Sequence, residues 1–455
     1  MTKTNHCNII NKNEIGGKRL RRKIYGKLLD WKRNNIDTPL MIIGARQVGK
    51  TYIINEFCKN EFEKYVYINL LDHSEIIKLF KENLSTEDKF NKLQMIINKP
   101  IDIEKTIIFF DEIQESEELI SSLKYFCENE KPFKIICAGS LLGVKINRFH
   151  SSFPVGKVIM IDMYPMSFEE FIMATVPETG EKLIDEIRKC YENNEEMIAP
   201  LHEKLMDMYR TYLCIGGMPN CINNYIQNNK DILRFNSQVI QNIISSYLKD
   251  MKKYVINSFE ATKIEEIYQT IPSQLENTSR KFQYSKIKKG ARRNEYESAL
   301  NWLYSSTMVH KCIALNSINI PPKAYIDNET FKLFLSDVGI LSSLLEIQFR
   351  EILLDKPFLY KGILAENYVA QEFKQNNISL YYWKSKSQAE IDFIIYNEDG
   401  LIPIEVKSSD NVKAKSLYVY INRYNPSYAI RISSKNFGFE NGIKSVPLYA
   451  TFLIK

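Results

Sequence analysis

Short apolar runs alternate with longer segments of helical periodicity between Pro39 and residue 185. The runs are LMIIG, YVYINL, TIIFFDEI, FKIICAGS and GKVIMIDM, in that order. Apolar runs of this length, bounded by turn residues and separated by helical patterns, are typical of buried parallel strands. The pattern therefore predicts an α/β domain over residues 39–185.

A basic segment, KRLRRKIYGKLLDWKR, precedes this domain within residues 1–38. Its apolar residues Ile24, Leu28 and Trp31 recur at helical spacing, which predicts one amphipathic helix with a basic face. Such a face is either solvated or in contact with nucleic acid or phosphate, and the pattern does not decide between the two.

The remaining residues fall into three segments. Residues 186–260 carry mostly helical periodicity, broken by a turn at Gly216–Pro219. Residues 261–345 contain three helical segments and then two β-like ones, KCIALN and KAYIDNETFKLFL, an order that predicts a winged helix. Residues 355–455 run as helix, three strands, helix and strand, which predicts a second α/β unit.

Composition supports a packed protein of several domains. A chain of 455 residues exceeds one ordinary domain, and 44% hydrophobic with 25% charged residues excludes disordered and collagen-like classes. The 61 basic and 55 acidic residues leave a net charge of +6, which permits a nucleic-acid partner without requiring one. Since no apolar run approaches the roughly 20 residues of a membrane span, we expect a soluble, cytoplasmic protein with no membrane partner. The eight cysteines form no CxxC pair and the five histidines are dispersed, so neither a disulfide framework nor a His/Cys metal site is expected.

The motif GARQVGKT, from Gly44 to Thr51, matches G-x-x-x-x-G-K-[ST] and lies between a predicted strand and a predicted helix. Its glycines let backbone N–H groups close around phosphate oxygens, where a Cβ would clash. Lys50 supplies positive charge to the β- and γ-phosphates, and Thr51 offers its hydroxyl to Mg²⁺. The residues predicted to bind the nucleotide are Gly44, Ala45, Arg46, Gln47, Val48, Gly49, Lys50 and Thr51.

Acidic and polar residues end two other predicted strands. TIIFFDEIQ places Asp111 and Glu112 at a strand end, where Asp111 holds the metal ion and Glu112 polarises the attacking water. The alternative is an acidic pair that caps the next helix. Ser140 ends FKIICAGS, where it either contacts the γ-phosphate or the lytic water or is a plain turn residue.

These motifs carry a family resemblance. GARQVGKT, FFDEIQ, CAGSLL and GKVIMIDMYPMSFEEF resemble, in order, the motifs of a prokaryotic group of AAA+-like P-loop ATPases with a C-terminal domain of uncharacterised function. YLCIGGMPNCINNY and FLSDVGILSSLL look like the signatures of that C-terminal half. The resemblance implies Mg²⁺-dependent ATP binding and hydrolysis, with Lys50, Thr51, Asp111 and Glu112 in the Walker roles and Ser140 as first sensor. It also implies a homo-oligomer in which a neighbour's arginine completes the site.

One position departs from the family. Where the family commonly shows Gly-Arg before the last strand of the ATPase core, this sequence has Gly156 and Lys157. A lysine keeps the positive charge but loses the bidentate fork of arginine. The sequence does not identify the arginine finger, and its candidates are Arg46 and Arg148.

Two carboxylates and a lysine form a second constellation near the C-terminus. Asp392 opens one strand, and Glu405 and Lys407 alternate on the next, so the latter two share a face. Asp392 and Glu405 can bind Mg²⁺ and position a water for phosphodiester attack. Glu366, on the apolar stripe of the preceding helix, is expected to point toward that site.

The order of these elements looks like the PD-(D/E)xK nuclease core, in which Glu366, Asp392, Glu405 and Lys407 are the catalytic candidates. An E-x-K pair is also common on solvated strand faces, and degenerate copies of an enzyme fold persist as binding modules. The predicted winged helix carries a basic cluster that either meets DNA phosphates or is an ordinary solvated surface. This cluster consists of Lys286, Lys288, Lys289, Arg292 and Arg293.

The sequence therefore predicts an α/β, AAA+-like P-loop NTPase sheet, then a helical and winged-helix region, then a small α/β nuclease-like domain. Two functions remain open. In the first, an ATPase cycle drives or switches a DNA-binding, nuclease-like C-terminal half. In the second, the chain is a nucleotide-switched protein-interaction or DNA-binding module whose nuclease-like domain is inactive.

Overall fold

The computed structural model describes residues 21–128, 132–140, 153–253, 255, 258–276, 280–354, 358–385, 389–408 and 415–455. The chain forms two units, the first up to Tyr164 with Ser305–Thr307, the second comprising Pro165–Tyr304 and Met308–Lys455. The predicted end of the first domain at residue 185 lies beyond this border. The reason is that α7 (Phe168–Thr175) and α8 (Gly180–Asn193) pack against elements of the second unit.

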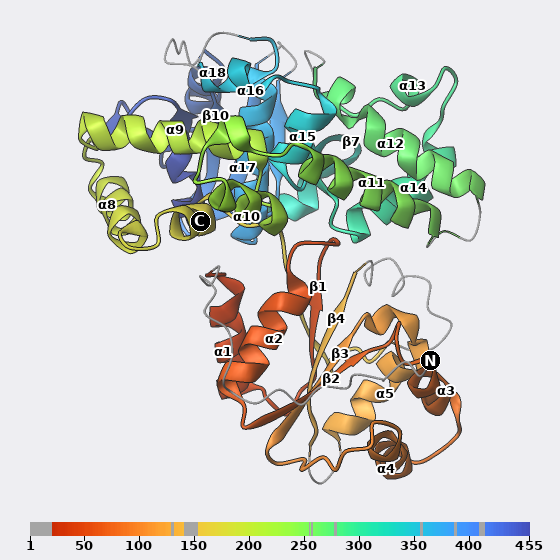
Figure 1. The fold of residues 1–455 in the computed structure, drawn as a ribbon. Coiled ribbons are helices and arrows are strands. Elements are labelled where there is room, and N and C mark those ends of the chain that lie inside the picture. Colours follow the sequence, from red (N-terminus) through yellow and green to blue (C-terminus); the bar gives the residue numbers. More distant parts are fainter. Residues whose placement is uncertain are drawn as a thin grey trace. The chain divides into compact units, whose positions relative to one another are not determined.

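The first unit is built on a five-stranded parallel sheet in the order β2-β3-β4-β1-β5 (Figure 1). All five strands are apolar runs that the sequence predicted. Because every pairing is parallel, the carboxyl ends of β1, β3 and β4 meet at one edge, where open α/β sheets bind ligands. The strands are β1 (Leu40–Ile43), β2 (Lys64–Asn69), β3 (Thr106–Asp111), β4 (Lys134–Gly139) and β5 (Ile159–Asp162).

Helices cover both faces of this sheet, which explains why β1, β3 and β4 are buried almost throughout. One face forms a core with α3 (Ser74–Lys81), α4 (Thr86–Ile96) and α5 (Glu117–Cys127). The other face packs against α2 (Lys50–Glu61), and α1 (Ile24–Asn34) lies on α2 (Figure 1). The buried residues of α1 are the predicted stripe of Ile24, Leu28 and Trp31.

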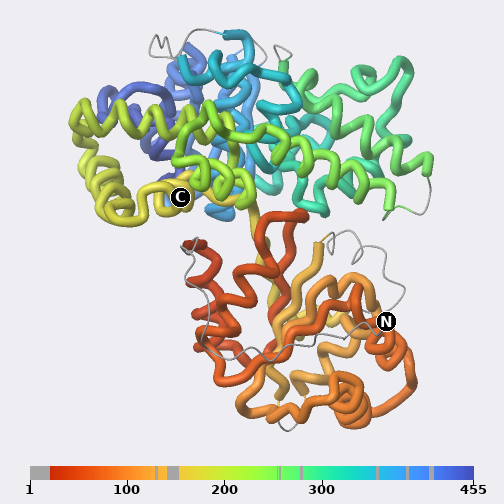
Figure 2. The backbone as a smooth tube through the Cα atoms, in the orientation of Figure 1, coloured from red at the N-terminus to blue at the C-terminus, as the bar shows by residue number. Residues whose placement is uncertain are grey.

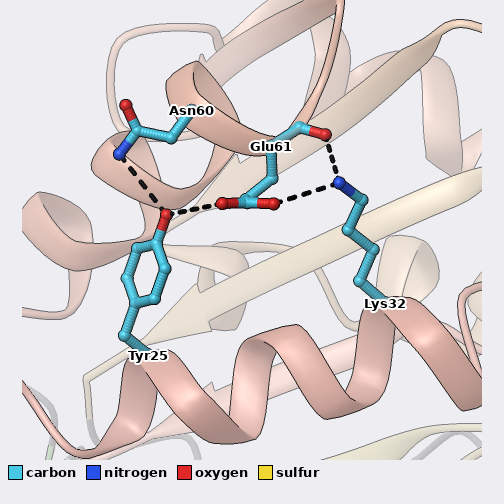
Figure 3. Close-up of polar contacts among 4 residues, drawn as sticks. All are labelled: Tyr25, Lys32, Asn60 and Glu61. Atoms are coloured by element: carbon cyan, nitrogen blue, oxygen red, sulfur yellow. Dashed lines mark hydrogen bonds and ion pairs between the residues drawn. The ribbon is translucent and has the colours of Figure 1, made fainter.

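Part of the basic face of α1 is used to hold α2 (Figure 3). Lys32 donates to the Glu61 backbone carbonyl and pairs with Glu61 Oε2 at 3.1 Å. Tyr25 donates its hydroxyl proton to Glu61 Oε1 at 3.0 Å and accepts a hydrogen bond from Asn60. At Lys32, therefore, the basic helix makes an intramolecular contact.

The second unit begins with helices. The α8 and α9 helices lie beside η4 (Leu448–Leu453), close to the C-terminus, although they are far from it in sequence (Figure 2). Across the described ranges, none of the helices has the length and apolar character needed to cross a membrane. The further helices are α9 (Ala199–Ile215), α10 (Pro219–Gln227), η2 (Ile232–Arg234), α11 (Gln238–Lys253), α12 (Ser258–Glu276), α13 (Tyr284–Ile287), α14 (Arg293–Ser305), η3 (Pro322–Tyr325), α15 (Val338–Leu344), α16 (Phe349–Leu353), α17 (Lys361–Gln375) and α18 (Lys415–Tyr424).

An eight-stranded mixed sheet follows, in the order β12-β13-β11-β10-β9-β8-β6-β7. The α17 helix packs on it through Phe373 against Phe393, with ring centroids 5.5 Å apart. The α18 helix packs through Tyr420 against Trp383, at 5.3 Å. The strands are β6 (Val309–Leu315), β7 (Ile326–Leu335), β8 (Tyr381–Lys384), β9 (Glu390–Asn397), β10 (Gly400–Val406), β11 (Ala429–Ser433), β12 (Gly438–Glu440) and β13 (Ile443–Pro447).

The β6–β7 hairpin belongs to this sheet. After three helices in the predicted order, β6 pairs antiparallel with β7 and also parallel with β8, so that Ile313 faces Tyr381. The segments predicted as separate domains, 261–345 and 355–455, therefore share one sheet. The local sequence pattern predicts the β6–β7 hairpin. It does not predict the pairing of β6 with β8, which lies much later in the chain.

The turn between α9 and α10 is held by a buried carboxylate. Asp337 caps α15, accepting from the Ile340 N–H at 3.0 Å, and it also accepts from the Gly217 N–H at 2.7 Å. Gly216 has a φ of 73°, and a Cβ there would lie 2.1 Å from Asp337 Oδ1. Only glycine fits at this position. The segments IGGMP and SDVG, which are far apart in sequence, are therefore in direct contact through Asp337.

Asp337 predicts a pH dependence of stability. Burial raises its pKa to about 6 although three backbone N–H groups oppose the shift. Because the pKa of Asp337 is higher in the folded state than in the unfolded state, protonation of this group stabilises the fold. This stabilisation is complete below about pH 4 and is lost as the pH rises through about 6. We expect Asp337→Asn to flatten the fall in unfolding free energy over that window, by up to about 3 kcal/mol. Urea unfolding of both proteins at several pH values measures this, and parallel curves would contradict it.

Candidate nucleotide site and C-terminal carboxylates

The P-loop follows β1 and curls around the amine of Lys50. Lys50 is buried, and its Nζ donates to the carbonyls of Gly44 and Ala45, both at 2.8 Å. Gly49 has a φ of 95°, in the region that favours glycine. At Gly44 a Cβ would lie 2.2 Å from the Met163 carbonyl oxygen. Both glycines of the motif are thus required by the backbone.

The Asp111 carboxylate lies beside the start of α2. Its Oδ2 accepts from Thr51 Oγ1 at 2.8 Å and from the Tyr67 hydroxyl at 3.1 Å, and its Oδ1 accepts from the Glu112 N–H at 3.0 Å. Burial raises the pKa of Asp111, and the hydrogen bond from Thr51 opposes this. Tyr67 was not identified from the sequence. The pairing of its strand, β2, with β3 brings it to Asp111, and this pairing is not visible in the sequence.

Glu112 has a left-handed backbone, with a φ of 53°. Its side chain accepts from Gln114 Nε2 and, at 3.3 Å, from Ser140 Oγ at the end of β4. The next α-helix, α5, is capped instead by Ser116, which accepts from the Leu119 N–H at 3.1 Å. The carboxylate of Glu112 therefore does not cap α5. It lies at the carboxyl edge of the sheet, bonded to Gln114 and Ser140.

The donor set at this edge fits Mg²⁺. Thr51 Oγ1 and Asp111 Oδ2 are hard oxygen donors 2.8 Å apart, next to the lysine that would meet phosphate. Magnesium prefers oxygen ligands and, in phosphate sites, uses one or two protein groups together with phosphate oxygens. Thr51 and Asp111 are the residues that would hold it.

The candidate arginine-finger positions differ in their surroundings. Lys157, which replaces the family's arginine, pairs with Glu128 at 2.9 Å on the surface. Arg46 lies in the P-loop and is partly buried. Arg148 lies outside the described residues.

The structure brings together Asp392 on β9, Glu405 on β10 and Lys407 directly after β10. Asp392 Oδ2 accepts from the Val406 N–H at 2.8 Å, and Lys407 Nζ pairs with Glu405 Oε1 at 2.8 Å. Burial raises the pKa of Glu405, the contact with Lys407 lowers it, and the charge of Asp392 raises it further. Two carboxylates so placed suit a hard cation. Within the described ranges, no group of three or more His, Cys, Asp or Glu side chains could hold a metal ion.

Glu366 is buried as predicted, but its side chain is paired with two basic residues. Arg280 pairs with its Oε1, and Lys332 Nζ lies 4.0 Å from its Oε2. Lys332 is fully buried on β7 and also pairs with Glu390 Oε1 at 2.7 Å. We expected Glu366 to point toward Asp392. In the structure, Glu366 belongs to an ion-pair cluster with Arg280, Lys332 and Glu390. Sequence reasoning missed Lys332 because a strand lysine is ordinarily exposed.

The basic cluster of the predicted winged helix lies at α13 and the start of α14. Lys288, Lys289 and Arg292 are exposed. Arg293 pairs with Glu297 at 3.2 Å and with Glu329 at 3.5 Å. Nearby carboxylates thus offset part of this charge.

The parallel sheet with this strand order, the complete P-loop after β1 and the acidic pair at the end of β3 define a P-loop NTPase fold. Accordingly, residues 37–172 match the AAA domain family. Residues 206–351 and 361–451 match two domains of unknown function, DUF8612 and DUF4143. The search of curated proteins gave no match.

Solved structures similar to this chain include the following two. The Walker-type ATPase PABY2304 of Pyrococcus abyssi is 16% identical with a TM-score of 0.45, and the match covers 72% of this chain and 96% of that one. The ORC2 protein of Aeropyrum pernix, in ADPNP and ADP complexes, is 12% identical with a TM-score of 0.36, covering 73% and 92%.

Proposed function

We propose that the first unit binds ATP with Mg²⁺ and hydrolyses it. The observation that carries the proposal is the convergence of Lys50, Thr51, Asp111 and Glu112 at one sheet edge. Mg²⁺, when bound with nucleotide, would neutralise phosphate charge. Lys50 holds the β- and γ-phosphates, Glu112 orients the attacking water, and Ser140 with Gln114 fixes the Glu112 carboxylate. A homo-oligomer in which a second copy supplies an arginine is part of this proposal.

We further propose that the nucleotide cycle drives or switches the second unit on DNA, with Asp392, Glu405 and Lys407 as a nuclease-like site. The support is the ion pair of Lys407 with the buried Glu405, next to Asp392, which accepts from the Val406 N–H on the same strand as Glu405. The exposed lysines around α13 would contact DNA phosphates, which position a protein without reading sequence.

Plasmid nicking with Mg²⁺ tests the nuclease. We expect cleavage by the wild type and a loss of at least about 100-fold in Asp392→Ala and in Lys407→Ala, because each removes a group that acts on the phosphodiester. Asp399→Ala and Lys435→Ala remove exposed charges of the same type and serve as matched controls. Cleavage that survives in both site variants would contradict the assignment.

The second candidate function is a nucleotide-switched binding module without strand cleavage. The ion-pair cluster around Glu366 favours it, because two cations already compensate a carboxylate that the nuclease core would use. No nicking by the wild type, with ATP-dependent retention of DNA, would select this function.

A further inference from the structure

Directly before α1, an arginine of the basic segment is buried at the P-loop. Arg22 is 9% exposed, whereas its neighbours Arg21 and Lys23 are exposed. Its Nη1 donates to the Val48 carbonyl, inside the P-loop, at 2.8 Å. Its Nη2 donates to the Tyr164 carbonyl, also at 2.8 Å. The planar guanidinium thus joins two backbone carbonyls that are far apart in sequence.

Met163, the residue before Tyr164, supports the other end of the P-loop. The Met163 N–H donates to the Ile43 carbonyl at 2.7 Å, and the Met163 carbonyl closes on Gly44 so tightly that no Cβ fits. The first residue of the loop therefore rests directly on Met163. Its fifth residue, Val48, is tied to the adjacent Tyr164 through Arg22.

We infer that Arg22 is a positioning residue of the nucleotide site, an inference that rests on the proposed ATPase function. A peptide group is planar and trans, so holding the Val48 carbonyl also fixes the direction of the Gly49 N–H. That N–H is one of the loop donors that close around phosphate. Arg22 acts through the backbone and does not itself meet the nucleotide. It sets the affinity for nucleotide phosphates more than the rate of the chemical step.

The test compares Arg22→Gln and Arg22→Lys with Arg21→Gln, which removes the same charge from an exposed position. The Kd of a fluorescent ATP analogue and of ADP, the KM and kcat for ATP, and the unfolding temperature are measured for each. A hydrogen bond from a charged donor contributes enough that we expect Arg22→Gln to raise both Kd values by about 10-fold or more. Arg22→Lys reaches one carbonyl only and should be intermediate, while kcat stays within about threefold in all variants.

The outcomes separate this inference from the proposed function. A wild type that binds no ATP overturns both. A wild type that binds ATP, with unchanged Kd in Arg22→Gln and Arg22→Lys, overturns the role of Arg22 alone. If Arg22→Gln fails to fold, Arg22→Lys keeps the charge and decides the question. A rise in KM with nearly constant kcat supports positioning, whereas a fall in kcat alone would overturn it.

Discussion

Replacing Glu112 with glutamine is expected to lower ATP turnover by at least about 100-fold while leaving ATP binding intact. Glu112 lies directly after β3, and its carboxylate is held by Gln114 and Ser140 beside the P-loop edge. Glutamine has nearly the same shape but cannot take up a proton from the attacking water. The P-loop, Lys50 and Thr51 are untouched, so the variant should retain the triphosphate. Phosphate release under steady-state conditions and retention of labelled ATP measure the two effects.

Glu117→Gln is the matched control for this variant. Glu117 lies in the first turn of α5, five residues further on, so glutamine there removes the same charge while the contact between Glu112 and Ser140 is kept. We expect its turnover to stay within about twofold of the wild type, as for most surface changes. Wild-type turnover in Glu112→Gln would remove Glu112 from the catalytic role.

The sequence was most informative where structure is local. The strands of the parallel sheet are mainly apolar, so all five are visible in the sequence as apolar runs. The P-loop is equally visible because its glycines and Lys50 act within eight neighbouring residues. The sheet order and the Tyr67 contact with Asp111 were not predictable, since they depend on which strands become neighbours after folding. Arg22 illustrates the same limit, because its partners Val48 and Tyr164 lie in distant segments.

The second unit shows where pattern reasoning reaches its limit. Its helices and most strands follow from periodicity, and the Asp392, Glu405 and Lys407 contacts follow from adjacent strands. The pairing of β6 with β8, which merges two predicted domains into one sheet, has no local signal. The burial of Glu366 follows from its apolar stripe. Its cationic partners do not, because Lys332 reaches it only through the folded sheet.

Lys332→Met is expected to lower the unfolding free energy of the second unit by about 3–5 kcal/mol. Methionine matches the lysine in volume, so the change is mainly electrostatic. Lys332 is fully buried between Glu390, at 2.7 Å, and Glu366, at 4.0 Å. Removing the ammonium leaves two carboxylates with less compensation in a poorly solvated site, since Glu366 then keeps its pair with Arg280 and Glu390 keeps the more distant Lys384. Urea unfolding, followed by tryptophan fluorescence and circular dichroism, measures the loss.

Two comparisons test whether charge is the cause. Lys384→Met removes a partly exposed lysine that lies 3.9 Å from the same Glu390, and it should cost less than about 1 kcal/mol because solvent screens such pairs. The double variant Lys332→Met/Glu366→Gln should recover part of the loss, since one of the two carboxylates that lost the ammonium is then neutral. A deficit that is not relieved in the double variant would show that Lys332 acts by packing alone, and the ion-pair cluster would then be no argument about the role of Glu366.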